Sequence, residues 1–216
     1  MKERITLPKS ISSRSEFKRK FSLLEMYRAA VFAPRAMSKL IGNNKSKLVD
    51  QNFVKRIQLA VTEVNGCAIC SYGHAKMALR QGMSNEEINS FLGEGGGGNF
   101  IKPEEAKAIL FAQHFADSRG YPRKYAYDAI VKEYGEEKAQ IILSASQMMI
   151  TGNMYGIPLS ALQARLKGKP YKDSSLFYEL SMLIISILFL PIAIIHGLLR
   201  GLIGLSNIRF DESKSE

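Results

Sequence analysis

The sequence predicts an all-α protein: a compact helical bundle with an additional N-terminal amphipathic helix and a C-terminal hydrophobic helix. Three observations support this fold class. Apolar residues recur at intervals of three to four along most of the chain, which is the period of an amphipathic helix. No stretch of useful length alternates polar and apolar residues, as a half-buried strand would. The 216 residues, 46% of them hydrophobic, can bury one good core but would be cramped as two unrelated domains.

The N-terminal part divides into a basic flexible arm over residues 1–14 and a helical region over 15–50. Apolar side chains at Phe17, Phe21 and Leu24 predict an amphipathic helix from Ser15 that ends at Pro34. We expect this helix to pack on the core or on a neighbouring subunit rather than on a membrane. A second short helix is expected over 36–41.

The main helical domain is expected over residues 51–170. Asp50 or Asn52 can cap its first helix, which leads to Asn65-Gly66, and a second helix follows as far as Gly82. The next start signal is a capping box, in which Ser84 binds the backbone of Glu87 and Glu87 reaches back. The glycine-rich stretch 94–99 lacks the ending of a phosphate-binding loop, so it is expected to be a flexible connector.

Three further helices complete this domain. Pro103 at a first helical position predicts a helix to Ser118, and a short helix follows from Lys124 to Tyr134. The last helix opens at Glu136 and is expected to break near Gly152, where Asn153 and Tyr155 could line a pocket close to the cysteines. Lysine, glycine and proline together stop the domain at residues 167–170.

The tail has a different composition. Residues 180–199 carry no formal charge when His196 is neutral, and twenty helical residues span about 30 Å, the thickness of a bilayer core. A hydrophobic helical tail over 171–205, with membrane contact through 176–205, is therefore favoured over a helix packed within an oligomer. A single span, an in-plane helix and a hairpin that turns at Pro191 all remain open. Residues 206–216 form a polar tail.

Charge and cysteine usage indicate a cytoplasmic location. Basic residues exceed acidic ones by ten, and the first twenty residues hold half of this excess. A basic arm beside a hydrophobic tail favours an anionic membrane surface and no nucleic acid. No secretory signal is visible, and two cysteines in one motif fit a redox pair in a reducing compartment. The protein is therefore expected on the cytoplasmic side, associated with the membrane through its tail.

The cysteine motif is the candidate site. Cys67, Cys70 and His74 would share one face of the helix that begins after Gly66. The positive end of a helix lowers a cysteine pKa, and a histidine one turn away can take or donate a proton. These residues predict a dithiol that cycles to a disulfide, with no cofactor and no metal. His114 could complete a zinc set, but its spacing matches no familiar zinc module, so a structural histidine is favoured.

The arrangement Cys-x-x-Cys-x-x-x-His, preceded by Asn65-Gly66 and a helix, resembles the alkylhydroperoxidase D and carboxymuconolactone decarboxylase family, loosely from about Val54 to Gly168. The resemblance implies an all-helical fold and usually a homo-oligomer. It also implies an antioxidant, peroxidase-type role, in which Cys70 attacks the peroxide, Cys67 resolves the sulfenic acid and His74 relays a proton. An external dithiol of the lipoyl or thioredoxin type would restore the pair.

Two positions depart from the family pattern. Where redox-active members commonly carry a glutamate that partners the histidine, twelve residues before the first cysteine, this chain has Lys55. A positive neighbour disfavours a protonated His74 but favours a nearby thiolate. Glu63 is a candidate substitute in the relay, and Ile69 fills a spot where some members place a second histidine.

Three functions follow from these residues. A thiol-dependent peroxidase or related dithiol oxidoreductase ranks first. A non-enzymatic, membrane-attached redox sensor or scaffold is the alternative, because Lys55 replaces the usual glutamate. A carboxymuconolactone decarboxylase-like lyase ranks below both, since decarboxylases of the family generally lack the cysteine pair.

Overall fold

A computed structural model describes residues 15–93 and 97–211, and within these ranges the protein is all-helical, with eight α-helices and no strand. The predicted fold class is confirmed. The predicted basic arm, part of the glycine-rich connector and the end of the polar tail lie outside the described residues. The elements are α2 (Leu23–Ser46), α3 (Gln51–Asn65), α4 (Ala68–Arg80), α5 (Asn85–Leu92), the 3₁₀ turns η1 (Gly98–Phe100) and η2 (Pro103–Glu105), α6 (Ala106–Asp117), α7 (Lys124–Tyr134), α8 (Glu136–Leu166) and α9 (Leu176–Leu202).

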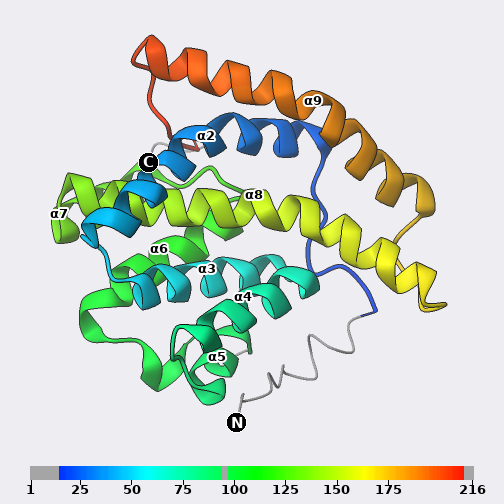
Figure 1. The fold of residues 1–216 in the computed structure, drawn as a ribbon, viewed down its shortest axis with the longest axis horizontal. Coiled ribbons are helices and arrows are strands. Elements are labelled where there is room, and N and C mark those ends of the chain that lie inside the picture. Colours follow the sequence, from blue (N-terminus) through cyan, green and yellow to red (C-terminus); the bar gives the residue numbers. More distant parts are fainter. Residues whose placement is uncertain (1–14, 94–96, 212–216) are drawn as a thin grey trace.

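The long helix α8 forms the centre of the molecule. On one side it packs against α3, α4 and α6, and on the other against α2, which in turn is covered by α9 (Figure 1). α8 is buried on several sides because its sequence is dense in small and apolar residues, among them Ala139, Ile142, Ala145 and Ile150. The core therefore lies along α8, with the cysteine-bearing helices on one side and, on the other, α2 together with the apolar C-terminal helix α9, which also contacts α8 directly.

The N-terminal helix differs from the prediction at both ends. It begins after Ser22, where Ser22 and Glu25 form a capping box, so residues 15–22 are not helical. It then continues through Pro34, and the two predicted helices are one. Proline removes one backbone hydrogen bond, but here α2 is held between α8 and α9 along its length. Tertiary packing has overridden the local signal.

The predicted break at Gly152 is also wrong, because α8 runs through Gly152, Gly156 and Pro158 without interruption. Gly156 allows the two cysteine sulfurs to approach the helix closely, whereas a Cβ at Gly152 would meet nothing within 4 Å. The predicted N-terminal caps of α3 and α5 have different outcomes. Of the two predicted caps of α3, Asp50 is the one used, and it accepts from the amides of Asn52 and Phe53. Ser84 accepts from the Glu87 amide, but the Glu87 carboxylate pairs with Arg56 instead of reaching back.

The helix α9 packs on α2 through a glycine. A Cβ at Gly197 would lie 2.1 Å from the backbone oxygen of Val31, so only glycine permits this approach. His196 adds a 3.1 Å contact between its Nδ1 and the Tyr27 hydroxyl, and Arg165 of α8 pairs with the buried Glu179. Within the described ranges, α9 alone is long and apolar enough to cross a membrane, and its most apolar stretch is 22% buried. Its outer face is a row of exposed aliphatic side chains.

Candidate redox site

The two cysteines lie where α3 ends and α4 begins. Gly66 ends α3 with a φ of 74°, a left-handed conformation that favours glycine, and this turn places Cys67 at the N-cap of α4. Cys67 Sγ accepts a hydrogen bond from the Cys70 amide at 3.3 Å. The position of Cys67 at a helix N-terminus agrees with the prediction. A thiolate there is stabilised by the unpaired amides of the first turn.

The cysteines form a disulfide, with 2.06 Å between the sulfur atoms and 5.2 Å between the Cα atoms. Cys67 is fully buried, whereas Cys70 is partly exposed. The two sulfurs therefore differ in accessibility. A molecule that approaches from solvent meets Cys70 first.

The disulfide rests on the backbone of α8. A Cβ built on Gly156 would lie 2.5 Å from both sulfur atoms, which leaves no room for any side chain there. Cys70 Sγ also lies 3.8 Å from the carbonyl oxygen of Gly152, one turn earlier. Ser160, one turn later, accepts a hydrogen bond from the Ile69 amide at 3.2 Å. Gly152, Gly156 and Ser160 recur every four residues, so one small-residue face of α8 forms the floor of the site.

Buried amides hold the supporting helices in place. Asn65 donates to the side-chain oxygen of Asn153 at 3.0 Å, and Asn153 in turn donates to Thr62. All three side chains are buried. This bridge ties the end of α3 to α8 just before the cysteines. Asn153 therefore acts as a structural tie rather than as the pocket residue that the sequence suggested.

His74 lies one turn beyond Cys70 on α4, and its neighbour is Lys55 of α3. The Lys55 ammonium lies 3.4 Å from His74 Nδ1 and donates to the Gln58 side-chain oxygen at 2.8 Å. An ammonium has only hydrogens to donate, so Nδ1 is the acceptor and the ring hydrogen lies on Nε2. Burial and the positive charge of Lys55 lower the pKa of His74 to about 4. His74 is therefore neutral at pH 7.

The other candidate residues, Glu63 and His114, have partners other than His74 and Lys55. Glu63 forms an ion pair with Lys18 rather than with His74. His114 accepts a hydrogen bond from the Arg123 amide at 3.0 Å, a structural role. Among the described residues no three histidine, cysteine or acidic side chains are grouped as a metal site would require. The sequence analysis missed Gly156 and Ser160, although their four-residue spacing in α8 is a signal of close helix approach.

A cavity of about 410 Å³ opens beside His74 and Lys55, bounded by α2, α3, α4 and α8. Its wall includes Gly152, whose carbonyl oxygen contacts Cys70 Sγ. Neither cysteine lines the cavity, and Gly152 lies between the cavity and the disulfide. The volume of the cavity falls in the range of small-molecule sites, about 300 to 1,000 Å³.

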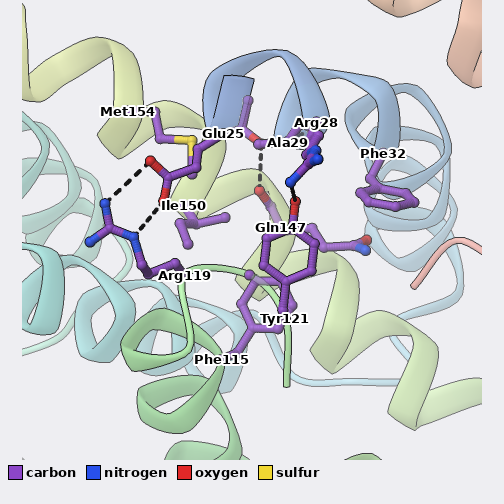
Figure 2. A pocket seen from close by; sticks show the side chains of 12 residues that line it. Glu25, Arg28, Ala29, Phe32, Phe115, Arg119, Tyr121, Gln147, Ile150 and Met154 are labelled. Atoms are coloured by element: carbon purple, nitrogen blue, oxygen red, sulfur yellow. Dashed lines mark hydrogen bonds and ion pairs between the residues drawn. The ribbon is translucent and has the colours of Figure 1, made fainter. Parts of the chain in front are cut away.

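A second hollow lies between α2, α8 and the turn after α6, and Figure 2 shows that its polar groups satisfy one another. Arg119 pairs with Glu25, and Arg28 lies 3.4 Å from the Tyr121 hydroxyl. It has room for about 20 Å³, which is enough for roughly one water molecule. We assign this hollow a packing role.

Comparison with known families agrees with the location of the site. Residues 35–96 match the model of the carboxymuconolactone decarboxylase family. This confirms the resemblance and covers the second half of α2 through α5, with the cysteine motif inside. The match begins before the expected Val54 and ends well short of Gly168. No curated protein and no solved structure matches the chain.

Proposed function

We propose that the protein is a thiol-dependent peroxidase, or a related dithiol oxidoreductase, whose Cys67–Cys70 pair cycles between dithiol and disulfide. The observation that carries the proposal is the disulfide at the N-terminus of α4. It lies in the segment that matches the carboxymuconolactone decarboxylase family, which contains both alkylhydroperoxidase D-type peroxidases and decarboxylases. A dithiol at a helix N-terminus is a reactive pair without any metal or flavin.

In the oxidative half of the proposed catalytic cycle, the Cys70 thiolate attacks the terminal oxygen of a hydroperoxide. The O–O bond breaks, Cys70 becomes a sulfenic acid and the alkoxide leaves with the electron pair. The Cys67 thiolate then attacks the Cys70 sulfur and expels hydroxide, which is protonated to water. The net reaction converts two thiols and one hydroperoxide into a disulfide, an alcohol and water.

His74 and Lys55 are the proposed source of the proton for the alkoxide. His74 can donate from Nε2 while Nδ1 accepts from the Lys55 ammonium, so that the proton lost by the imidazole is replaced at the other nitrogen. Burial lowers the pKa of Lys55 to about 8, which makes this ammonium a stronger acid than an exposed lysine. In this scheme Lys55 takes part in the relay with the opposite charge to the glutamate of the family pattern.

The reductive half uses an external dithiol of the lipoyl or thioredoxin type. Its thiolate would attack the more exposed Cys70 sulfur, and Cys67 would leave as a thiolate. The hydrogen bond from the Cys70 amide to Cys67 Sγ stabilises that leaving group. The second thiol of the reductant then releases Cys70. Assembly as a homo-oligomer remains a prediction.

Steady-state peroxide consumption tests this proposal. Wild-type protein supplied with dihydrolipoamide, or with thioredoxin and its reductase, should consume tert-butyl hydroperoxide catalytically. Cys70→Ser should lose the activity, and Cys67→Ser should lose turnover with dithiol. Lys76→Gln, a change at an exposed residue of α4, is the control for damage to this helix. Wild-type rates in either cysteine variant would exclude the mechanism.

The alternative function is a redox sensor that switches a partner without peroxide turnover. One observation favours it: burial, together with the positive charge of Lys55, lowers the pKa of His74 and keeps its ring neutral. A change of oligomeric state on oxidation, with peroxide consumption at background, would establish the sensor. A decarboxylase-like lyase is less well supported, since the cysteine pair has no part in that chemistry.

For location, we propose that α9 lies in the plane of the cytoplasmic membrane surface. Its outer face includes Ile187 and Leu188, which are 65% and 69% exposed. A span is disfavoured because α9 is held along α2, with Gly197 against Val31 and Gly201 near Arg35. A spanning α9 would draw the charged side chains of α2 into the hydrocarbon. A helix half-immersed at the interface keeps them in water.

Vesicle flotation tests this location. The protein should float with vesicles that contain anionic phosphatidylglycerol and less with pure phosphatidylcholine. The double variant Ile187→Asp/Leu188→Asp should reduce binding at least tenfold. Leu110→Asp, which removes a 64% exposed leucine from α6, is the matched control and should bind as wild type does. Equal binding by all three proteins would exclude α9 as the contact.

A further inference from the structure

The cavity beside the redox site has one polar end and one apolar wall. Its apolar lining comes from three helices: Met37, Leu40 and Ile41 of α2, Val54 of α3, and Met148 and Met149 of α8. Methionine-rich walls adapt to flexible apolar ligands. The polar end combines Gln51, Lys55 and Gln58 of α3 with His74 of α4, and further polar side chains line the cavity at Asn43 and Asn44 of α2 and at Gln81 after α4.

Lys55 gives this polar end an unbalanced positive charge. The residue is 7% exposed, and its ammonium contacts only Gln58 and His74 among the described residues, with no carboxylate beside it. The other charged groups buried to this extent are paired: Arg56 holds Glu87 and Glu105, and Glu179 holds Arg165. A buried charge without a counter-ion is costly. An anion in the cavity would remove this cost.

A second polar group at the same end lacks a partner. Gln51 lines the cavity, and its amide nitrogen is buried and donates to no acceptor in the described residues. A carboxylate has two oxygens and accepts several hydrogen bonds. It could take more than one from the Lys55 ammonium.

From this geometry we infer that the cavity is a binding site for an apolar monocarboxylate, such as a medium-chain fatty acid. The carboxylate lies against Lys55, and the hydrocarbon chain lies on the methionine and leucine wall. This inference goes beyond the proposed peroxidase and does not depend on turnover. Because His74 and Gly152 border the cavity, and the Gly152 carbonyl oxygen lies 3.8 Å from Cys70 Sγ, we expect the bound acid to slow thiol–disulfide exchange at Cys70.

Burial supports the assignment through the acidity of Lys55. Its pKa is lowered to about 8 because the charged form is desolvated. A carboxylate next to the ammonium restores a favourable partner and raises this pKa again. Binding should therefore take up protons near pH 8 and weaken above that pH.

Titration calorimetry with decanoate, decyl phosphate and decanol tests the inference on the oxidised, full-length protein. Decanoate should bind at least tenfold more tightly than decanol, which has the same chain without the charge. Decanoate should also bind about tenfold more tightly than octanoate, since each added methylene is buried. Tighter binding of decyl phosphate than of decanoate would overturn the carboxylate assignment.

Variants separate the charge from the fold. Lys55→Gln should bring decanoate binding within threefold of decanol binding, and Lys55→Arg should restore most of the preference. Lys76→Gln, on the exposed side of α4, is the matched control and should leave binding unchanged. If Lys55→Gln is too unstable, the loss of decanoate affinity of the wild type between pH 7 and 9.5 gives the same answer. An unchanged preference in Lys55→Gln, or at high pH, would overturn the proposal.

The effect on the redox pair is measured separately. Saturating decanoate should slow reduction of the disulfide by dithiothreitol at least fivefold in the wild type and leave it unchanged in Lys55→Gln. An unchanged rate in the wild type would overturn the expected effect on exchange at Cys70. A protein that binds decanoate but never consumes peroxide would retain this site and lose the proposed function. A protein that consumes peroxide but shows no preference for decanoate over decanol would retain the proposed function and lose the carboxylate site.

Discussion

At two glycines on opposite sides of the molecule, the missing side chain allows a neighbouring segment to approach closely, but the two contacts differ in what surrounds them. At Gly156 the absence of a side chain lets a disulfide rest on α8, and at Gly197 it lets α9 rest on the backbone of α2. The surroundings differ. The first contact is bordered by a neutral histidine next to a buried lysine and by a cavity, and the second by exposed aliphatic residues. Close packing alone therefore indicates nothing about function, and the groups presented beyond the contact separate a reactive site from an attachment surface.

The largest expected effect comes from filling the space below the disulfide. Gly156→Val places methyl groups where both sulfurs now lie, because even a Cβ would be 2.5 Å from each of them. We expect peroxide-driven disulfide formation to fall at least 100-fold, with a loss of about 1 to 3 kcal/mol in stability from overpacking. Stopped-flow thiol loss and thermal unfolding measure the two effects. A variant that forms the disulfide at the wild-type rate would remove Gly156 from the site.

The histidine–lysine pair predicts a pH dependence that the α9 contact lacks. The lowered pKa of His74, about 4, means that the unfolded chain binds a proton more readily than the folded one between pH 6.5 and 4. Stability is therefore lost as the pH falls through this window, by about 2 to 3 kcal/mol. Urea unfolding of wild type and of His74→Gln at pH 7 and pH 4.5 should show a larger loss where His74 is present, since carboxylates of lowered pKa such as Glu25 and Glu179 contribute equally to both proteins. An equal loss in both would assign it to other groups.

Gly197→Ala should break the second contact and spare the first. Its Cβ would lie 2.1 Å from the Val31 oxygen, so α9 must shift or detach. We expect about 1 to 3 kcal/mol of destabilisation and earlier proteolysis within α9. Single-turnover peroxide reaction should stay within twofold of the wild type. A matching loss of reactivity would show that the two contacts are coupled through α2 and α8.

The smallest effect is expected where a helical glycine makes no contact. A Cβ at Gly42 in α2 meets nothing within 4 Å, so Gly42→Ala should stabilise the protein by about 0.5 to 1 kcal/mol through helix propensity alone. Denaturant unfolding gives the sign. Destabilisation by Gly42→Ala would mean that the position of a glycine near the end of its helix, and not the space around its Cβ, decides how the protein responds to an added side chain.

Local signals predicted much of the fold. Helical periodicity gave the all-α class, the start of α3 at Asp50 and the bounds of α7, and the cysteine spacing located the disulfide at a helix N-terminus. The errors arose where distant packing decides. Pro34 and Gly152 are helix breakers by local rules, yet α2 and α8 continue through them. Gly197 of α9 packs near Pro34, and Cys70 of α4 contacts the carbonyl oxygen of Gly152. Gly156 lies far from Cys70 along the chain, and nothing local connects them.

The direct test of the account is a single-turnover reaction followed by mass spectrometry. The reduced protein is mixed with one equivalent of tert-butyl hydroperoxide. We predict that the wild type loses two hydrogens as the Cys67–Cys70 bond forms. Cys67→Ser should instead gain one oxygen on Cys70, and Cys70→Ser should not react on the same time scale. Wild-type protein that keeps both thiols, or oxygen found on Cys67 in Cys70→Ser at the wild-type rate, would contradict the account.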